Sequence, residues 1–302
     1  MNATGFAWPT RAGIPWIELL LLLVAVFWGT SYGMTKSALV YTSVFMFLAV
    51  RFLLTFLVLL IPTLRDFKQG RNSDWRAALP TGAILLLIFC CEVFGVSQTT
   101  ATNAAILISL SAIFTVFVEM WVNNKRMNLG YLGFAFASIV GVALLTFDGS
   151  FSESLNTGDL LILTAALLRA FMVTTTKRFT EGKQITTLSL TALQSLVVGL
   201  GALFVVLAKP EIHSTGLLPD ATEFWFITGY LVLFCTLFAF FVQNYAVRKL
   251  SPTKVSLLMG SEPLFGALFA VVWLGEALTL IQIGGAITIF VSVMLVTIKK
   301  VE

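Results

Sequence analysis

Residues 251–265 read SPTKVSLLMGSEPLF, and an apolar run continues from there to Leu274. This sequence places a carboxylate and a helix breaker, Glu262 and Pro263, where hydropathy puts the middle of a membrane span. An ionisable side chain at that depth is costly, and proline removes a backbone hydrogen-bond donor. Both are tolerated where they face the inside of a helix bundle or a water-filled cavity. The stretch therefore predicts a perturbed membrane helix beside a polar interior.

The composition of the whole chain is that of an integral membrane protein. Of its 302 residues, 58% are hydrophobic and 11% are charged, whereas soluble proteins carry about 25% charged residues. The mean hydropathy is +0.94. Polar interruptions divide the chain into ten apolar runs, each near the roughly 20 residues that a spanning helix needs. The first run lacks a small-residue cleavage site after its apolar stretch, so we expect it to be retained and not removed as a signal peptide.

We therefore predict an all-α integral membrane fold with ten transmembrane helices and no soluble domain. The expected spans are residues 14–34, 43–61, 77–96, 103–122, 129–147, 159–176, 186–208, 224–247, 254–274 and 278–298.

Lysine and arginine predict the orientation of these spans. Fifteen of them fall at the termini or in even-numbered loops, and two, Lys36 and Lys209, fall in odd-numbered loops. The positive-inside rule then places both termini in the cytoplasm. The net charge of +4 is thus explained by topology, and we expect no nucleic acid partner.

An internal repeat is indicated by an offset of 150 residues, which lays Ser111 on Ser261 and Leu107 on Leu257. Because each half holds an odd number of spans, the second half enters the membrane in the opposite sense. We therefore predict two inverted five-helix repeats, residues 1–150 and 151–302. Secondary transporters built in this way hold their substrate near the midplane, between the halves.

Three segments resemble the EamA-type domains of the drug/metabolite transporter superfamily. They are FWGTSYG at 27–33, the Asn103-Ala104 pair that begins the fourth span, and the turn GEALT at 275–279 with its two flanking helices. The resemblance occurs in both halves and covers essentially the whole chain. It implies a ten-helix, multi-pass protein of the bacterial inner (cytoplasmic) membrane, similar to exporters of amino acids, including aromatic amino acids, and related metabolites. In one departure, the first half has Ala112-Ile113 where the second half has Glu262-Pro263, so the halves are expected to be functionally unequal.

The charged residues inside the spans are the first candidates for the site. Glu262 is expected either to contact substrate or to pair with another buried charge at a packing kink. Arg169 lies too deep in the sixth span to reach the interface. It either binds a substrate carboxylate or serves as the counter-ion of Glu262 or Glu92.

Glu92 in the third span has two readings that the sequence leaves open. Burial raises the proton affinity of a carboxyl group, so Glu92 or Glu262 could couple proton flow to transport. Alternatively, Glu92 is the partner of Arg51, which lies at a comparable depth in the second span. Two further carboxylates, Glu18 and Glu119, are expected at the interface, with Glu119 paired to Lys125 and Arg126.

The remaining candidates are polar or amphipathic side chains in spans 1, 3, 4, 6, 8 and 9, which we expect to wall the binding cavity. In the first span, Gly29 and Gly33 form a Gly-x-x-x-Gly face that permits close approach of a neighbouring helix. The candidate substrate-binding residues are Trp28, Ser31, Tyr32, Glu92, Asn103, Ser111, Arg169, Tyr230, Ser261 and Glu262.

Other function classes find less support in the sequence. The chain has one histidine, His213, in a loop, and three cysteines, Cys90, Cys91 and Cys235, within apolar runs. This distribution favours neither a metal site nor a disulfide framework, and we expect no cofactor. The sequence predicts a secondary transporter exporting small amphipathic metabolites, amino acids first, with membrane lipid and protons as further partners. A drug exporter of the same fold is the alternative, and a membrane-embedded enzyme or a channel is the alternative of another class.

Overall fold

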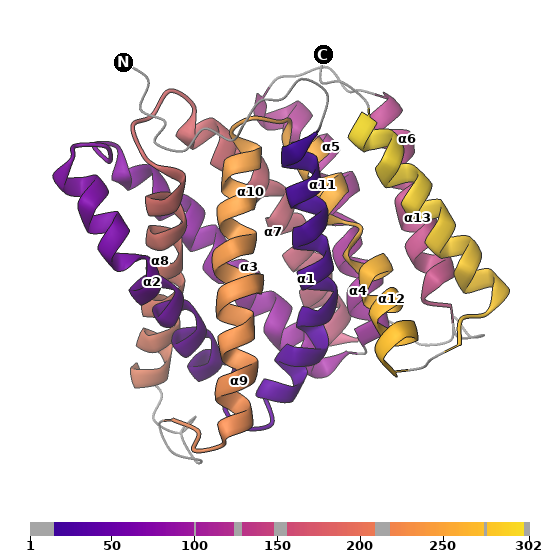
Figure 1. Cartoon of the computed structure of the whole chain (residues 1–302), viewed down its shortest axis with the longest axis horizontal. Helices are drawn as coiled ribbons and strands as arrows, with labels where there is room; N and C mark the ends of the chain where they lie inside the picture. The colour runs from indigo at the N-terminus through magenta and orange to yellow at the C-terminus, as the bar shows by residue number, and fades with distance from the viewer. Residues whose placement is uncertain are drawn as a thin grey trace.

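The computed structural model describes residues 15–99, 101–123, 129–147, 156–208, 218–274 and 277–298. These residues form a bundle of helices with no strand among them (Figure 1). Eight helical segments of the described part are long and apolar enough to cross a membrane, and Leu129–Leu145 is a shorter apolar helix. The chain is therefore an all-helical, multi-pass membrane protein.

The described residues of the first half form six α-helices and one short 3₁₀ turn. They are α1 (Trp16–Ala38), α2 (Val44–Lys68), η1 (Trp75–Ala77), α3 (Ala78–Gln98), α4 (Ala101–Ser109), α5 (Ser111–Asn123) and α6 (Leu129–Leu145).

The second half contains α7 (Thr157–Thr180), α8 (Thr187–Ala208), α9 (Thr222–Tyr230), the π-helical segment η3 (Leu231–Phe238), α10 (Ala239–Val247), α11 (Pro252–Met259), α12 (Glu262–Leu274) and α13 (Leu280–Ile298). Helices α9, η3 and α10 follow one another without a loop and form the predicted eighth span.

Two of the predicted spans are each broken into two helices. The ninth span is interrupted between α11 and α12, where Pro263 cannot donate to a carbonyl one turn earlier and the Ser261 hydroxyl donates to the Leu258 carbonyl at 2.7 Å. The fourth span is interrupted between α4 and α5, although it has no proline. There the Ser109 hydroxyl donates to the Ile106 carbonyl at 2.6 Å, a bond that competes with regular helix geometry.

The helices pack in pairs from opposite halves of the chain. Helix α2 packs along α8, α6 along α13 and α3 along α7, while α1 packs against α10, α11 and α12. Glycine permits the close pairing of α6 with α13, because a Cβ at Gly285 would lie 2.4 Å from the Leu145 nitrogen. The α2–α8 and α6–α13 pairs flank the bundle, with the remaining helices between them (Figure 1).

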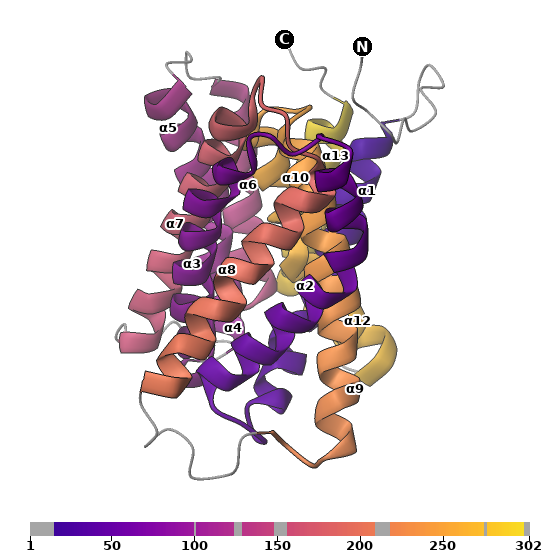
Figure 2. The same ribbon diagram turned by 90° about the vertical axis from the view of Figure 1, so that its left-hand side faces the viewer.

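The beginning of α1 and the end of α13 lie at the same end of the bundle (Figure 2). The interior is filled by a cluster of apolar side chains that extends through both halves, from Leu21 in α1 to Val296 in α13. Charged and polar side chains interrupt this core near its middle, and they form the site described next.

Candidate functional site

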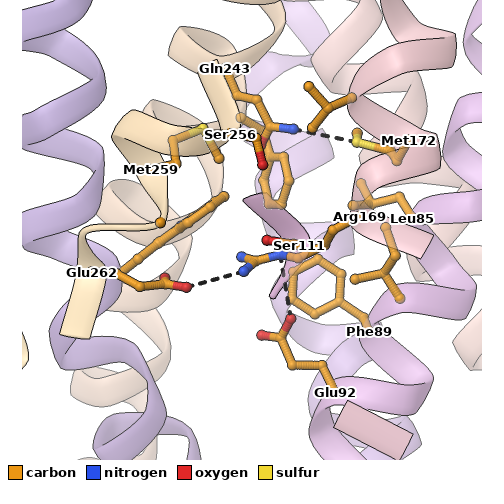
Figure 3. Close-up of a pocket in the computed structure, with 15 residues that line it drawn as sticks. Leu85, Phe89, Glu92, Ser111, Arg169, Met172, Gln243, Ser256, Met259 and Glu262 are labelled. Atoms are coloured by element: carbon orange, nitrogen blue, oxygen red, sulfur yellow. Dashed lines mark hydrogen bonds and ion pairs between the residues drawn. The ribbon is translucent and has the colours of Figure 1, made fainter. Parts of the chain in front are cut away.

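Arg169, in the middle of α7, is held between two carboxylates (Figure 3). Its Nη1 donates to Oε1 of Glu262 at 3.1 Å. Its Nε lies 3.8 Å from Oε2 of Glu92, which is an ion pair without a direct hydrogen bond. The three side chains come from α7, α12 and α3 and are largely shielded from solvent, with exposed fractions of 17%, 3% and 13% for Arg169, Glu262 and Glu92. In this conformation Arg169 is the counter-ion of both carboxylates.

Two aromatic residues of α1 complete this charged cluster. The guanidinium carbon of Arg169 lies 4.6 Å from the centroid of the Trp28 ring, within the range of a cation–π interaction. The Trp28 indole is itself oriented by its Nε1, which donates to the Cys235 carbonyl of η3 at 2.9 Å. Tyr32 donates from its hydroxyl to Oε1 of Glu262 at 3.3 Å.

The charged cluster holds two carboxylates against one guanidinium. Oε1 of Glu262 accepts from both Arg169 and Tyr32, whereas Oε2 of Glu262 and Oε2 of Glu92 have no hydrogen-bond partner among the described residues. A buried carboxylate oxygen without a partner is costly. The cluster is therefore suited to receive a proton, a cation or a hydrogen-bond donor.

Arg51 is not the partner of Glu92. Its Nε donates to the Thr236 hydroxyl of η3 at 2.7 Å, and its guanidinium lies 5.4 to 5.9 Å from the ring centroids of three phenylalanines: Phe47, Phe52 and Phe89. The sequence placed Arg51 and Glu92 at a similar depth, but Arg169 of α7 lies within ion-pair distance of Glu92, at 3.8 Å. The ion-pair partner of Glu92 is thus Arg169.

Two small cavities adjoin the charged cluster. The first has a volume of about 30 Å³ and the second about 20 Å³, enough for one or two waters each because a buried water needs roughly 10–15 Å³ of such space. Four residues line both cavities: Trp28, Phe89, Glu92 and Arg169.

The first cavity is lined by α1, α3, α5, α7, α10, α11 and α12, together with Gly260 between the last two. These are the helices of the six spans named from the sequence. Five of the candidate residues line it: Trp28, Glu92, Ser111, Arg169 and Glu262. Ser31 and Tyr32 line the second cavity.

The other three candidates lie elsewhere. Tyr230 hydrogen-bonds through its hydroxyl to the Thr30 hydroxyl at 2.8 Å and is not among the residues that line the two cavities. Ser261 uses its hydroxyl to terminate α11. Asn103 falls within α4, and its side chain lies outside the described part of the structure.

The other residues that line the first cavity were not among the candidate substrate-binding residues. They are Leu85, Ile88, Phe89, Met172, Val173, Phe240, Gln243, Ser256, Met259 and Gly260. Helical spacing could have found some of them, because positions three, four and seven residues before Glu92 share its face of α3. The same spacing after Arg169 leads to Met172 and Val173.

Glu119 and Glu18, which were expected at the membrane interface, are buried and bonded to residues of α11. Oε2 of Glu119 accepts from both the backbone nitrogen and the hydroxyl of Thr253, at 2.9 and 2.7 Å, at the start of α11. Glu18 accepts from Nζ of Lys254 at 2.8 Å, and only 2% of the Lys254 side chain is exposed. The predicted partners of Glu119, residues 125 and 126, lie outside the described residues.

The fold and the site together define a helical membrane protein with a charged cluster between its halves. The EamA-like transporter family matches residues 15–147 and 156–298 of this chain. The chain belongs to that family, within the drug/metabolite transporter superfamily.

Relatives found by sequence carry the same general name. An uncharacterized transporter of Archaeoglobus fulgidus is 30% identical over 296 residues, which cover 94% of this chain and 98% of the relative. The uncharacterized transporter YcxC of Bacillus subtilis is 26% identical over 273 residues and 88% of each chain. A crystal structure with a TM-score of 0.77 covers 94% of this chain and 96% of its own at 13% identity, a likeness of fold. The protein is therefore a membrane transporter and not an enzyme.

Proposed function

We propose that the protein is a secondary transporter that exports small zwitterionic metabolites, amino acids first, by alternating access. The observation that carries this proposal is the position of Arg169 between two carboxylates, at the boundary of two small cavities inside the bundle. A zwitterion carries one carboxylate and one ammonium group, which are the partners that this arrangement can accept.

Binding is an exchange of partners in this proposal. The substrate carboxylate takes the place of Glu262 on Arg169, and the ammonium group takes the carboxylate oxygens that are released. Oε2 of Glu92 and Oε2 of Glu262, which have no hydrogen-bond partner among the described residues, provide additional acceptors for the ammonium group. Because each charge keeps an opposite partner, the exchange avoids leaving an uncompensated buried charge.

The first cavity, at about 30 Å³, is too small for an amino acid, so the proposal requires the lining to move. Two of its lining residues, Met172 and Met259, are unbranched and flexible. The break between α11 and α12 lies directly beside it at Gly260. Rotation of these methionines and a change of angle at the break would enlarge the site.

The helix arrangement supports ten crossings in two inverted repeats, residues 1–150 and 151–302. The two breaks lie at matching places, since α5 begins at Ser111 and Ser261 directly precedes α12, the two residues aligned by the 150-residue offset. The pairing of α3 with α7 also has its counterpart in that of α1 with α10. Such repeats alternate access by rocking around a fixed central site. We place both ends in the cytoplasm on the distribution of lysine and arginine. We place the protein in a bacterial inner membrane on its likeness to bacterial members of the family.

Protons are the proposed coupling ion. Glu92 and Glu262 each have one oxygen with no hydrogen-bond partner among the described residues, where a proton could bind and weaken the hold on Arg169. Transport would then respond to a pH gradient.

An exporter of cationic or aromatic drugs is the second candidate. The observation that favours it is the combination of two carboxylates against one arginine with the aromatic lining residues Trp28, Phe89 and Phe240. A cation with an aromatic body would satisfy both features.

The test is counterflow in proteoliposomes. Vesicles are loaded with an unlabelled amino acid, drug or sugar phosphate, and uptake of labelled amino acid is followed with and without a pH gradient. Acceleration by amino acids is expected, and it should be lost in Arg169→Ala and in Glu262→Ala. The matched controls are Arg71→Ala and Glu181→Ala, two exposed charges at the bundle surface. Unchanged exchange of every amino acid in both cluster variants would defeat the proposal, and exchange only with drugs would favour the second candidate.

A further inference from the structure

Gln243 is a buried amide with one weak partner. It lies in α10 with 3% of its surface exposed and lines the first cavity. Its Nε2 donates to the Met172 sulfur at 3.4 Å, while its Oε1 has no hydrogen-bond partner among the described residues. A thioether is a weak acceptor, and an unsatisfied buried amide is costly. Packing alone gives no reason for a glutamine at this position.

Asn244, the next residue in α10, is a buried amide whose hydrogen bonds join helices. The Nδ2 of Asn244 donates to the Thr191 hydroxyl at 3.0 Å and to Oε1 of Gln194 at 2.7 Å. Gln194 in turn donates to the Thr81 hydroxyl at 2.9 Å, so this network joins α10, α8 and α3. Although Oδ1 of Asn244 also lacks a partner among the described residues, Asn244 does not line the first cavity.

The first cavity has a charged end and a neutral polar end. Arg169, Glu92 and Glu262 lie at one end, and Gln243 and Ser256 lie toward the other (Figure 3). Met172, the partner of Gln243, follows Arg169 by three residues in α7. Three residues of helix correspond to a rise of about 4.5 Å. The positions in α7 that carry Arg169 and the partner of Gln243 are thus less than one helical turn apart.

We propose that Gln243 selects for the tip of the substrate side chain and favours zwitterions whose side chain ends in a hydroxyl or an amide. This inference rests on the proposed function. The charged end holds the carboxylate and ammonium groups, and the side chain extends between Leu85, Phe89 and Met172 toward Gln243. The amide can both accept and donate. A site built to hydrogen-bond a substrate group rejects an isostere that lacks it, because its own polar group is then left unpaired.

The experiment compares isosteric substrates in the counterflow assay. Threonine and valine form one pair, and asparagine and leucine form another. Wild-type protein should exchange the polar member about tenfold faster at low concentration, as expected for one hydrogen bond between neutral groups. In Gln243→Met, which keeps the length of the side chain, the ratio should fall to about one while exchange of valine and leucine persists.

A matched control and a second measurement separate recognition from folding. Asn244→Leu removes the amide of the next residue in α10, which does not line the first cavity, so the ratio of threonine to valine exchange should be kept. Protection of the purified protein against thermal unfolding by threonine, relative to valine, should be present in wild type and lost in Gln243→Met.

Two failures can be told apart. If wild-type protein exchanges amino acids without preferring the polar isostere, or if Gln243→Met keeps the preference, the role of Gln243 is refuted and the proposed function stands. If wild-type protein exchanges no zwitterion at all, the proposed function fails and this inference fails with it.

Discussion

At the scale of single residues, Gly29 shows how closely α1 approaches α12, the helix that carries Glu262. A Cβ on Gly29 would lie 2.7 Å from the Glu262 carbonyl oxygen and 2.7 Å from the Gly266 nitrogen, both of which are backbone atoms. Gly33, the second glycine of the predicted Gly-x-x-x-Gly face, has nothing within 4 Å of the same position. Of the two glycines, only Gly29 is therefore required for the contact between α1 and α12.

We expect Gly29→Ala to force α1 away from α12, which would destabilise the protein by about 1–3 kcal/mol and reduce exchange because Glu262 would be displaced. Gly33→Ala should change stability by less than about 0.5 kcal/mol. Thermal unfolding in detergent and counterflow measure the two effects. Equal behaviour of the two variants would contradict the close contact at Gly29.

At the scale of elements, the first residues of α11 bond to side chains of two other helices, α1 and α5. Lys254 bonds to Glu18 of α1, and Glu119 of α5 accepts two hydrogen bonds from Thr253. Both glutamates were expected at the interface, but they lie with exposed fractions of only 9% and 6%. Buried ion pairs are costly to break on one side, because the remaining charge then has no partner.

We expect Lys254→Met to destabilise the protein by about 3–5 kcal/mol, since the Glu18 carboxylate would lose its cation. The double variant Glu18→Gln with Lys254→Met should recover most of this loss, because no charge is left unpaired. Thermal unfolding of the wild type, both single variants and the double variant measures the coupling. Additive effects of the two substitutions would show that the pair does not act as a unit.

At the scale of the whole molecule, helices from the two halves pair with one another, and the breaks in the fourth and ninth spans lie at matching positions. The inverted repeat that we propose would produce such an arrangement. Matching loops of the two halves should then lie on opposite sides of the membrane. The loop after α2 and the loop after α8 are such a pair.

Gln69→Cys, at the end of α2, and Asp220→Cys, before α9, test this arrangement. Both positions are exposed, and Cys90, Cys91 and Cys235 are first replaced by alanine. A membrane-impermeant thiol reagent should label Asp220→Cys in intact spheroplasts and Gln69→Cys in inside-out vesicles. Labelling of both positions from the same side would refute the inverted repeat.

Some of the site could be predicted from the sequence, because the position of a residue along a span gives its depth in the membrane. Glu262, Arg169 and Glu92 are recognisable as buried charges from hydropathy alone, and they do meet in the structure. The sequence left two partners open for Glu92, because Arg51 and Arg169 both lie inside the membrane and only the packing of the helices decides between them. Gln243 carries no charge, so membrane depth does not set it apart from other polar residues of its span; the structure adds that it lines the first cavity and that its Oε1 has no hydrogen-bond partner among the described residues.

The sequence by itself determined that this protein crosses the membrane many times and which side chains are too polar to face lipid. These properties follow from the free energy of transferring each segment from water to hydrocarbon, which depends on composition and length. Only the tertiary structure decided which helices pair, that Arg169 joins both carboxylates, and that the fourth span breaks without a proline. Those outcomes depend on close packing between helices distant in the chain, where a glycine or a rotation of one helix selects the partner.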